Sequence, residues 1–207
     1  VSLMELIQFR RTLTETEAQC LLWQALQALA YMRSRHIIHR DLKVGNIFLD
    51  EKMCLKIGDF GLACVMSTED ERKLTFCGTP NYMAPEMLKN TRSNANSHLN
   101  IGCGPSVDIR AFGVIAYVLL FGRPPFETKE ITVTYLKISK CQFTFPESSI
   151  VSQAARELIQ SIFTTVDERC SLYDISCHKF FYQSPFPASL TNESYKRPFN
   201  FAHLSTL

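Results

Sequence analysis

His39-Arg40-Asp41-Leu42-Lys43-Val44-Gly45-Asn46 is the stretch of sequence that decides the fold. It combines a base, a cation and an amide in one turn region, just before two short β-prone runs at 47–49 and 55–57. The polar residues between these runs predict a small hairpin. Asp59-Phe60-Gly61 follows the hairpin directly, so a tight return of the chain would bring Asp59 beside Asn46. Two oxygen ligands would then face one site.

Oxygen ligands of this kind suit magnesium. Mg²⁺ prefers hard oxygen atoms and keeps phosphate oxygens and water in its shell, so one carboxylate and one amide suffice. Such a site suits a nucleoside triphosphate. Ala84-Pro85-Glu86 closes the loop that begins at Asp59, and three motifs in this order at these spacings rarely coincide.

The three motifs resemble the catalytic-loop, metal-loop and loop-end signatures of protein kinases. By this resemblance Asp41 accepts the proton of the substrate hydroxyl, and Lys43 neutralises the transferring phosphoryl group. Asn46 and Asp59 would hold Mg²⁺ and, with Lys43, bind ATP. A lysine two residues after the aspartate resembles serine/threonine kinases rather than tyrosine kinases.

A finer resemblance is to the polo-like kinase family, and it extends from Ser2 to about Phe181. Besides the stretch quoted first, it rests on Leu13-Thr14-Glu15, Lys56-Ile57-Gly58-Asp59-Phe60-Gly61-Leu62-Ala63, Cys77-Gly78-Thr79-Pro80-Asn81-Tyr82 and Gly122-Arg123-Pro124-Pro125-Phe126-Glu127-Thr128. It implies protein substrates and an intracellular protein of the cytoplasm and nucleus, at the centrosome, spindle or kinetochore, that acts in the cell cycle and mitosis.

The same resemblance makes Thr75 the site of an activating phosphate, added by an upstream kinase and paired with Arg40. A phosphate adds close to two negative charges and can pair bidentately with arginine, which would order the loop. The alternative is that Thr75 is an ordinary exposed loop hydroxyl.

Other motif residues are expected to support the site rather than to react. His39 would pack and hydrogen-bond the backbone, and Asp108 would accept backbone amides beneath the catalytic loop. Glu86 and Arg169 would form a buried ion pair. The remaining residues with an expected supporting role are Arg40, Phe60 and Gly61.

Apolar residues at three- and four-residue steps predict helices over 14–35 and 107–121, and weaker ones over 128–138 and 152–163. Thr14 and Glu17 form a capping box at the start of the first helix. The predicted fold class is mainly α with a small β-hairpin, as in the C-terminal lobe of a protein kinase. Residues 1–183 are assigned to the kinase domain, and 184–207 to an irregular C-terminal tail.

Nothing in the sequence resembles the Gly-rich phosphate loop, the strand lysine or the helix glutamate of a kinase. We therefore expect the N-terminal β-rich lobe to be absent from this chain. Because the ATP pocket of a kinase lies between two lobes, we expect this chain alone to bind ATP weakly and to have negligible catalytic turnover.

Composition argues against several other classes of protein. The chain has 207 residues, and its 22 basic and 20 acidic side chains nearly cancel, which favours neither nucleic acid nor a membrane surface as a partner. The longest apolar run, 114–121, is much shorter than the ~20 residues that cross a bilayer. The eight cysteines form no CxxC pair, which favours reduced, buried thiols over a disulfide or metal framework.

Three features depart from the family pattern. Arg110 stands where most such kinases have tryptophan, and a buried guanidinium there would need a backbone carbonyl, Glu86 or solvent as its partner. Residues 90–104 read as an insertion, and Thr164-Thr165-Val166-Asp167 lacks the aspartate-proline expected before Arg169. These departures leave an alternative function open, namely a catalytically inactive kinase-derived binding module or scaffold.

Overall fold

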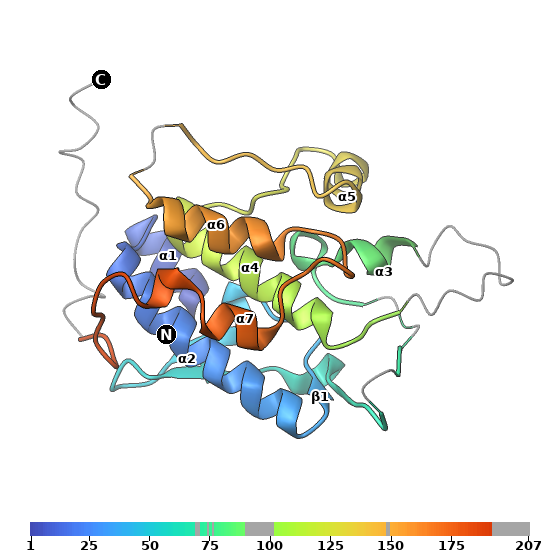
Figure 1. The fold of residues 1–207 in the computed structure, drawn as a ribbon, viewed down its shortest axis with the longest axis horizontal. Helices are drawn as coiled ribbons and strands as arrows, with labels where there is room; N and C mark the ends of the chain where they lie inside the picture. The colour runs from blue at the N-terminus through green and yellow to red at the C-terminus, as the bar shows by residue number, and fades with distance from the viewer. Residues whose placement is uncertain (69–70, 74, 76, 90–101, 148–149, 192–207) are drawn as a thin grey trace, which may run out of the picture.

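The computed structural model describes residues 1–68, 71–73, 75, 77–89, 102–147 and 150–191. The described part is mainly helical with two small sheets, which confirms the predicted fold class (Figure 1). The helices are α1 (Leu3–Arg10), α2 (Glu15–Ser34), α3 (Pro85–Lys89), α4 (Ser106–Phe121), α5 (Ile131–Ser139), α6 (Gln153–Ile162) and α7 (Leu172–Ser176). The strands are β1 (Ile37–Ile38), β2 (Ile47–Leu49), β3 (Leu55–Ile57) and β4 (Cys64–Val65), and short 3-10 turns are η1 (Val44–Asn46), η2 (Phe60–Leu62), η3 (Pro80–Tyr82) and η4 (Lys179–Phe181).

Helix α4 forms the centre of the core. Every residue from Val107 to Leu120 is buried, as expected for a helix that is apolar on nearly all sides. It packs between α2 and α6, and Figure 1 shows it running through the middle of the molecule. The C-cap residue Gly122 has a φ of 76°, and a Cβ there would lie 2.7 Å from the carbonyl oxygen of Arg11, so the turn that ends α4 requires glycine.

Helices α1 and α2 both begin with capping boxes. Thr14 accepts the amide of Glu17 and Glu17 caps the amide of Thr14, as the sequence predicts. Helix α1, which has no counterpart among the predicted helices, begins with a box formed by Ser2 and Glu5. Glu17 also accepts a bidentate pair of hydrogen bonds from Arg10, at 3.2 and 3.0 Å, and both side chains are buried. This ion pair fixes the end of α1 against the start of α2.

The two sheets are short antiparallel pairs. Strands β2 and β3 pair Ile47 with Ile57 and Leu49 with Leu55, which confirms the predicted hairpin. Strands β1 and β4 pair Ile38 with Cys64, a contact between distant parts of the chain for which the sequence analysis has no expectation.

Arg110 has a different environment from any that the sequence suggests. Its side chain is fully buried, and in the described structure none of its three guanidinium nitrogens has a hydrogen-bond partner. The expectation that a carbonyl, Glu86 or solvent would be its partner is therefore wrong. The guanidinium instead lies between the rings of Phe126 and Phe163, 4.3 Å from each centroid. Burial lowers the pKa of Arg110 to about 9, so the side chain stays a cation at neutral pH and its contacts are cation–π interactions.

The segment 184–191 is irregular but packed. Leu190 is buried, and the ring of Phe186 lies 6.3 Å from that of Trp23 on α2. Gln24 links this segment to the hairpin, because its amide nitrogen donates to Ala188 O at 3.2 Å and its amide oxygen accepts from Leu55 N at 2.8 Å. Residues 192–207 lie outside the described part of the chain.

Several smaller expectations concern particular side chains. All eight cysteines are free thiols, but only Cys20 and Cys103 are buried, so the expectation of generally buried thiols is wrong. Of the suggested insertion 90–104, residues 90–101 lie outside the described structure. No helix among the described residues is long and apolar enough to cross a membrane.

Candidate active site

The two small sheets hold the catalytic loop, residues 39–46, next to the loop that contains Asp59. At one end Ile38 pairs with Cys64, and at the other Ile47 pairs with Ile57. The Gly58 amide also donates to Asn46 O at 2.9 Å. The motifs that the sequence places on either side of the hairpin are therefore held side by side.

His39 joins the two loops through its ring. The ring is fully buried, Nδ1 accepts from the Asp41 amide at 3.3 Å, and Nε2 lies 3.0 Å from Gly58 O. A carbonyl can only accept, so Nε2 is the nitrogen that donates to Gly58 O. The ring of Phe60 packs against it with the centroids 5.0 Å apart. His39 thus packs and hydrogen-bonds the backbone, as the sequence analysis expects.

Asp108, in the first turn of α4, holds the catalytic loop from below. Its carboxylate accepts the amides of His39 at 2.8 Å and Arg40 at 2.9 Å, the expected contacts. Burial raises the pKa of Asp108, and the two amide hydrogen bonds offset only part of that effect. Arg40 has a φ of 66°, a conformation that non-glycine residues rarely adopt, and Asp108 stabilises it.

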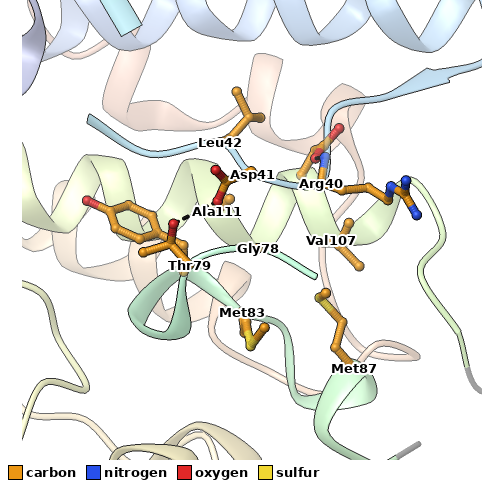
Figure 2. Close-up of a pocket in the computed structure, with 11 residues that line it drawn as sticks. Arg40, Asp41, Leu42, Gly78, Thr79, Met83, Met87, Val107 and Ala111 are labelled. Atoms are coloured by element: carbon orange, nitrogen blue, oxygen red, sulfur yellow. Dashed lines mark hydrogen bonds between the residues drawn. The ribbon is translucent and has the colours of Figure 1, made fainter. Parts of the chain in front are cut away.

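Asp41, Lys43 and Thr79 form a closed triangle of hydrogen bonds. Lys43 Nζ donates to Asp41 Oδ2 at 2.7 Å and to Thr79 Oγ1 at 3.0 Å. Thr79 Oγ1 donates to Asp41 Oδ1 at 2.7 Å, the bond drawn in Figure 2. Burial acts to raise the pKa of Asp41, but the hydrogen bonds from Lys43 and Thr79 outweigh it and the net shift is downward. Asp41 is therefore ionised at neutral pH.

Gly78 makes this triangle possible. It has a φ of 104°, and a Cβ at this position would lie 2.7 Å from the carbonyl oxygen of Arg40. Only glycine lets the backbone come this close to the catalytic loop. Together Gly78 and Thr79 dock the end of the 59–86 loop onto Asp41, and both line the pocket drawn in Figure 2.

Asn46 and Asp59 are the predicted metal ligands. The Asn46 amide nitrogen donates to Asp41 O at 2.9 Å and to Asp41 Oδ2 at 3.3 Å, which leaves its amide oxygen as the atom that could ligate a metal. Asp59 is exposed, has a φ of 60°, and accepts the Gly61 amide at 3.3 Å. One amide oxygen and one accessible carboxylate form a donor set that fits Mg²⁺ with phosphate and water as further ligands.

Thr75 and Arg40 are not paired by any contact in the described structure. Arg40 Nε donates to Leu62 O at 2.7 Å, in the Asp59 loop. Thr75 is exposed, and its carbonyl accepts from the Cys103 thiol at 3.5 Å. A phosphate-dependent pairing of the two residues stays a prediction.

The expected ion pair of Glu86 and Arg169 is present and buried. The guanidinium donates to both carboxylate oxygens, at 2.7 and 3.0 Å. It also donates to the backbone carbonyls of Ser106, Thr164 and Ile162, so α3, the start of α4 and the end of α6 meet at one side chain.

Comparison with known proteins agrees with this geometry. A family model described as the protein kinase domain matches residues 1–181. The chain is 44% identical over 190 residues to the cell cycle serine/threonine-protein kinase CDC5/MSD2 of Saccharomyces cerevisiae, and 40% identical over 189 residues to the serine/threonine-protein kinase polo of Drosophila melanogaster. The chain belongs to the polo-like family of protein kinases. Each of these two matches covers 91% of the kinase chain but only 26% and 31% of the relative, so the chain spans less than a third of their length.

Sequence reasoning predicted that Asp41, Lys43 and Asn46 meet, but it gave no role to Thr79, which also bonds the Asp41 carboxylate. Thr79 enters the sequence analysis only as part of the stretch 77–82 that carries the family resemblance. The sequence did contain a signal, since a glycine followed by a hydroxyl residue just before the loop-end motif indicates close approach to another backbone. Which backbone it approaches depends on contacts between residues far apart in the chain.

Proposed function

We propose that the protein containing this chain transfers the γ-phosphoryl group of ATP to serine or threonine hydroxyls of protein substrates. The observation that carries the proposal is the ionised Asp41 carboxylate, which Lys43 and Thr79 hold in place next to the Asn46 amide. Catalysis of phosphoryl transfer consists mainly of positioning and charge stabilisation, and such a rigid group of side chains provides both.

Each side chain has a distinct role in this reaction. Asp41 orients the substrate hydroxyl and accepts its proton. Lys43 supplies positive charge where the transferred group carries negative charge. Mg²⁺, when bound, neutralises phosphate charge, and Asn46 and Asp59 are the residues that would hold it.

Regulation and location belong to the same proposal. Thr75 is the site at which an upstream kinase would act, and its exposure supports this role. The yeast relative is named as a cell cycle kinase, which supports a role in the cell cycle and mitosis. The location that we propose is the cytoplasm and nucleus.

An assay of phosphate transfer tests the function. The longest natural protein that contains this chain is incubated with Mg²⁺, labelled ATP and a protein substrate that has serine or threonine residues. We expect Asp41→Asn to lower the rate at least about 100-fold, because a positioned base contributes 10² or more. Asp167→Asn, at an exposed aspartate away from the site, is the matched control and should leave the rate unchanged. Equal rates for wild type and Asp41→Asn would overturn the proposal and favour a scaffold without ATP chemistry.

A further inference from the structure

Helix α5 carries exposed apolar residues on its outer face. Thr134 and Ile138 are its buried residues and mark the face that points to the core. Because an α-helix has 3.6 residues per turn, Val133 and Leu136 fall on the opposite side. They are 38% and 49% exposed, and their spacing of three residues makes them neighbours on the helix surface. Two adjacent apolar side chains that point away from the core favour contact with a partner.

Two lysines continue the outer face towards the C-terminal end of α5. Lys137 and the C-cap residue Lys140 lie four and seven residues after Val133, which places them on the same side of the helix. Neither lysine forms an ion pair with another residue of the described part of the chain. Glu127 and Glu130 lie at the other end of α5. The outer face is therefore apolar in the middle and positive at one end, which is complementary to an amphipathic segment that carries carboxylates.

Helix α5 also lies close to the loop that reaches Asp41. It packs against η3 and against α3, and Figure 1 shows it beside α3 at the edge of the molecule. The turn η3 begins directly after Thr79, whose hydroxyl donates to Asp41 Oδ1 at 2.7 Å. A protein bound to the outer face of α5 is thus one element away from the Asp41 carboxylate. This position favours a protein substrate as the occupant.

We propose that the outer face of α5 is a docking surface for protein substrates that carry an acidic amphipathic helix apart from the hydroxyl that is phosphorylated. The surface consists of Val133, Leu136, Lys137 and Lys140. Apolar side chains of the substrate cover the first two residues, and its carboxylates pair with the two lysines. The proposal rests on the function proposed above, because docking raises the local concentration of the substrate hydroxyl at Asp41 without touching the reacting atoms.

Fluorescence anisotropy with a labelled peptide tests the docking surface on the full chain, in the absence of ATP. The peptide is an amphipathic helix of about 15 residues with leucines on one face and glutamates beside them. We expect saturable binding, and we expect Leu136→Ser and Lys137→Glu each to weaken it about tenfold or more, because a few anchors dominate the affinity of an interface. Lys52→Glu makes the same charge change at an exposed lysine of the hairpin turn. It is the matched control, and its affinity should stay within about twofold of wild type.

An exchange of charges keeps the test independent of folding. A second peptide has lysines in place of the glutamates. It should bind wild type poorly and should bind the double variant of Lys137→Glu and Lys140→Glu more tightly than wild type, a gain that a misfolded chain cannot give. Equal binding of both peptides to wild type, or unchanged binding in folded Leu136→Ser, would overturn the docking surface. A dimer of the chain that Leu136→Ser abolishes would overturn it too, because a second copy would then cover this face.

A kinetic comparison tests whether the occupant is a substrate. The longest natural protein that contains this chain is assayed with a short serine peptide, either alone or joined by a flexible linker to the acidic helix. We expect the joined peptide to have a KM about tenfold or more below that of the serine peptide, and we expect the double lysine variant to lose this difference. Binding of the acidic helix without any difference in KM would overturn the assignment to substrates. Absence of phosphate transfer to either peptide would contradict the proposed function and the substrate role with it, whereas the anisotropy result without ATP would stand.

Discussion

At the scale of single residues, Arg110 and Arg169 are both buried but differ in their partners. Arg169 donates to a carboxylate and to several carbonyls, whereas Arg110 finds no hydrogen-bond partner among the described residues and lies against two phenylalanine rings. Removing a charge from water costs several kcal/mol, and hydrogen bonds offset more of this cost than cation–π contacts do. Arg110 is thus a residue that lowers the stability of the native state.

Replacement of Arg110 by methionine should raise the free energy of unfolding by about 1–3 kcal/mol, because a buried charge without hydrogen bonds is exchanged for an apolar chain. Chemical denaturation of the chain measures this change. Arg169→Met is the matched comparison and should lower the free energy of unfolding by about 3–5 kcal/mol, since it leaves Glu86 buried without a partner. A loss of stability in Arg110→Met would contradict this account.

Sequence reasoning works well at this scale where a role depends on near neighbours in the chain. Asp41, Lys43 and Asn46 lie within six residues and meet as the motif predicts. The environment of Arg110 depends on Phe126 and Phe163, which reach it only through the packing of separate segments. No local pattern contains that information.

At the scale of elements, local signals set the helices and the hairpin. The start of α2 follows from its capping box, and the hairpin from two β-prone runs around a polar turn. Helix α1 was missed although Ser2 and Glu5 have capping-box spacing, because its eight residues are too few to show a clear helical periodicity. The β1–β4 pair could not be predicted, since its partners are two residues long and far apart in sequence.

Glu17 connects α1 to α2, and its contribution to the stability of the protein should depend on pH. Burial acts to raise its pKa, but hydrogen bonds from Arg10 and Thr14 outweigh burial and lower it. Its contribution to stability is therefore present above the pKa of the unfolded chain, about 4.3, and is lost as pH falls through the lower folded-state pKa.

Glu17→Gln should lower the free energy of unfolding by about 3 kcal/mol at pH 7, because Arg10 keeps its burial but loses its ion pair. Below about pH 4 the difference from wild type should shrink as Glu17 itself becomes protonated. Denaturant titrations at several pH values measure both effects. A difference that is constant from pH 7 to pH 3 would show that the charge of Glu17 contributes nothing.

At the scale of the whole molecule, segments distant in sequence complete the core and the site. In the segment 184–191, Phe186 packs on Trp23 of α2 and Leu190 is buried, and Gln24 links the segment to the hairpin. Although irregular in structure, this segment is part of the packed body of the protein.

Leu190→Ala should lower the free energy of unfolding by about 2–3 kcal/mol, and with it the melting temperature, because it removes a buried side chain from the core. Ser189→Ala, at the exposed neighbouring position, serves as the control and should change stability by less than about 0.5 kcal/mol. Equal effects of the two changes would mean that the segment does not pack in solution.

The candidate active site also depends on the whole molecule, because the catalytic loop and the end of the 59–86 loop meet at Asp41. Thr79 and Lys43 hold the Asp41 carboxylate from both sides, so the three side chains should act as one unit. Residues that act as a unit show non-additive effects when they are removed together.

A double-mutant cycle of Asp41→Asn and Thr79→Val, measured as kcat for phosphate transfer to a protein substrate, tests this claim most directly. We predict that Thr79→Val alone lowers kcat about tenfold or more, and that adding it to Asp41→Asn causes little further loss. If the double variant instead loses the product of the two single effects, Thr79 does not act through Asp41 and the central claim is contradicted.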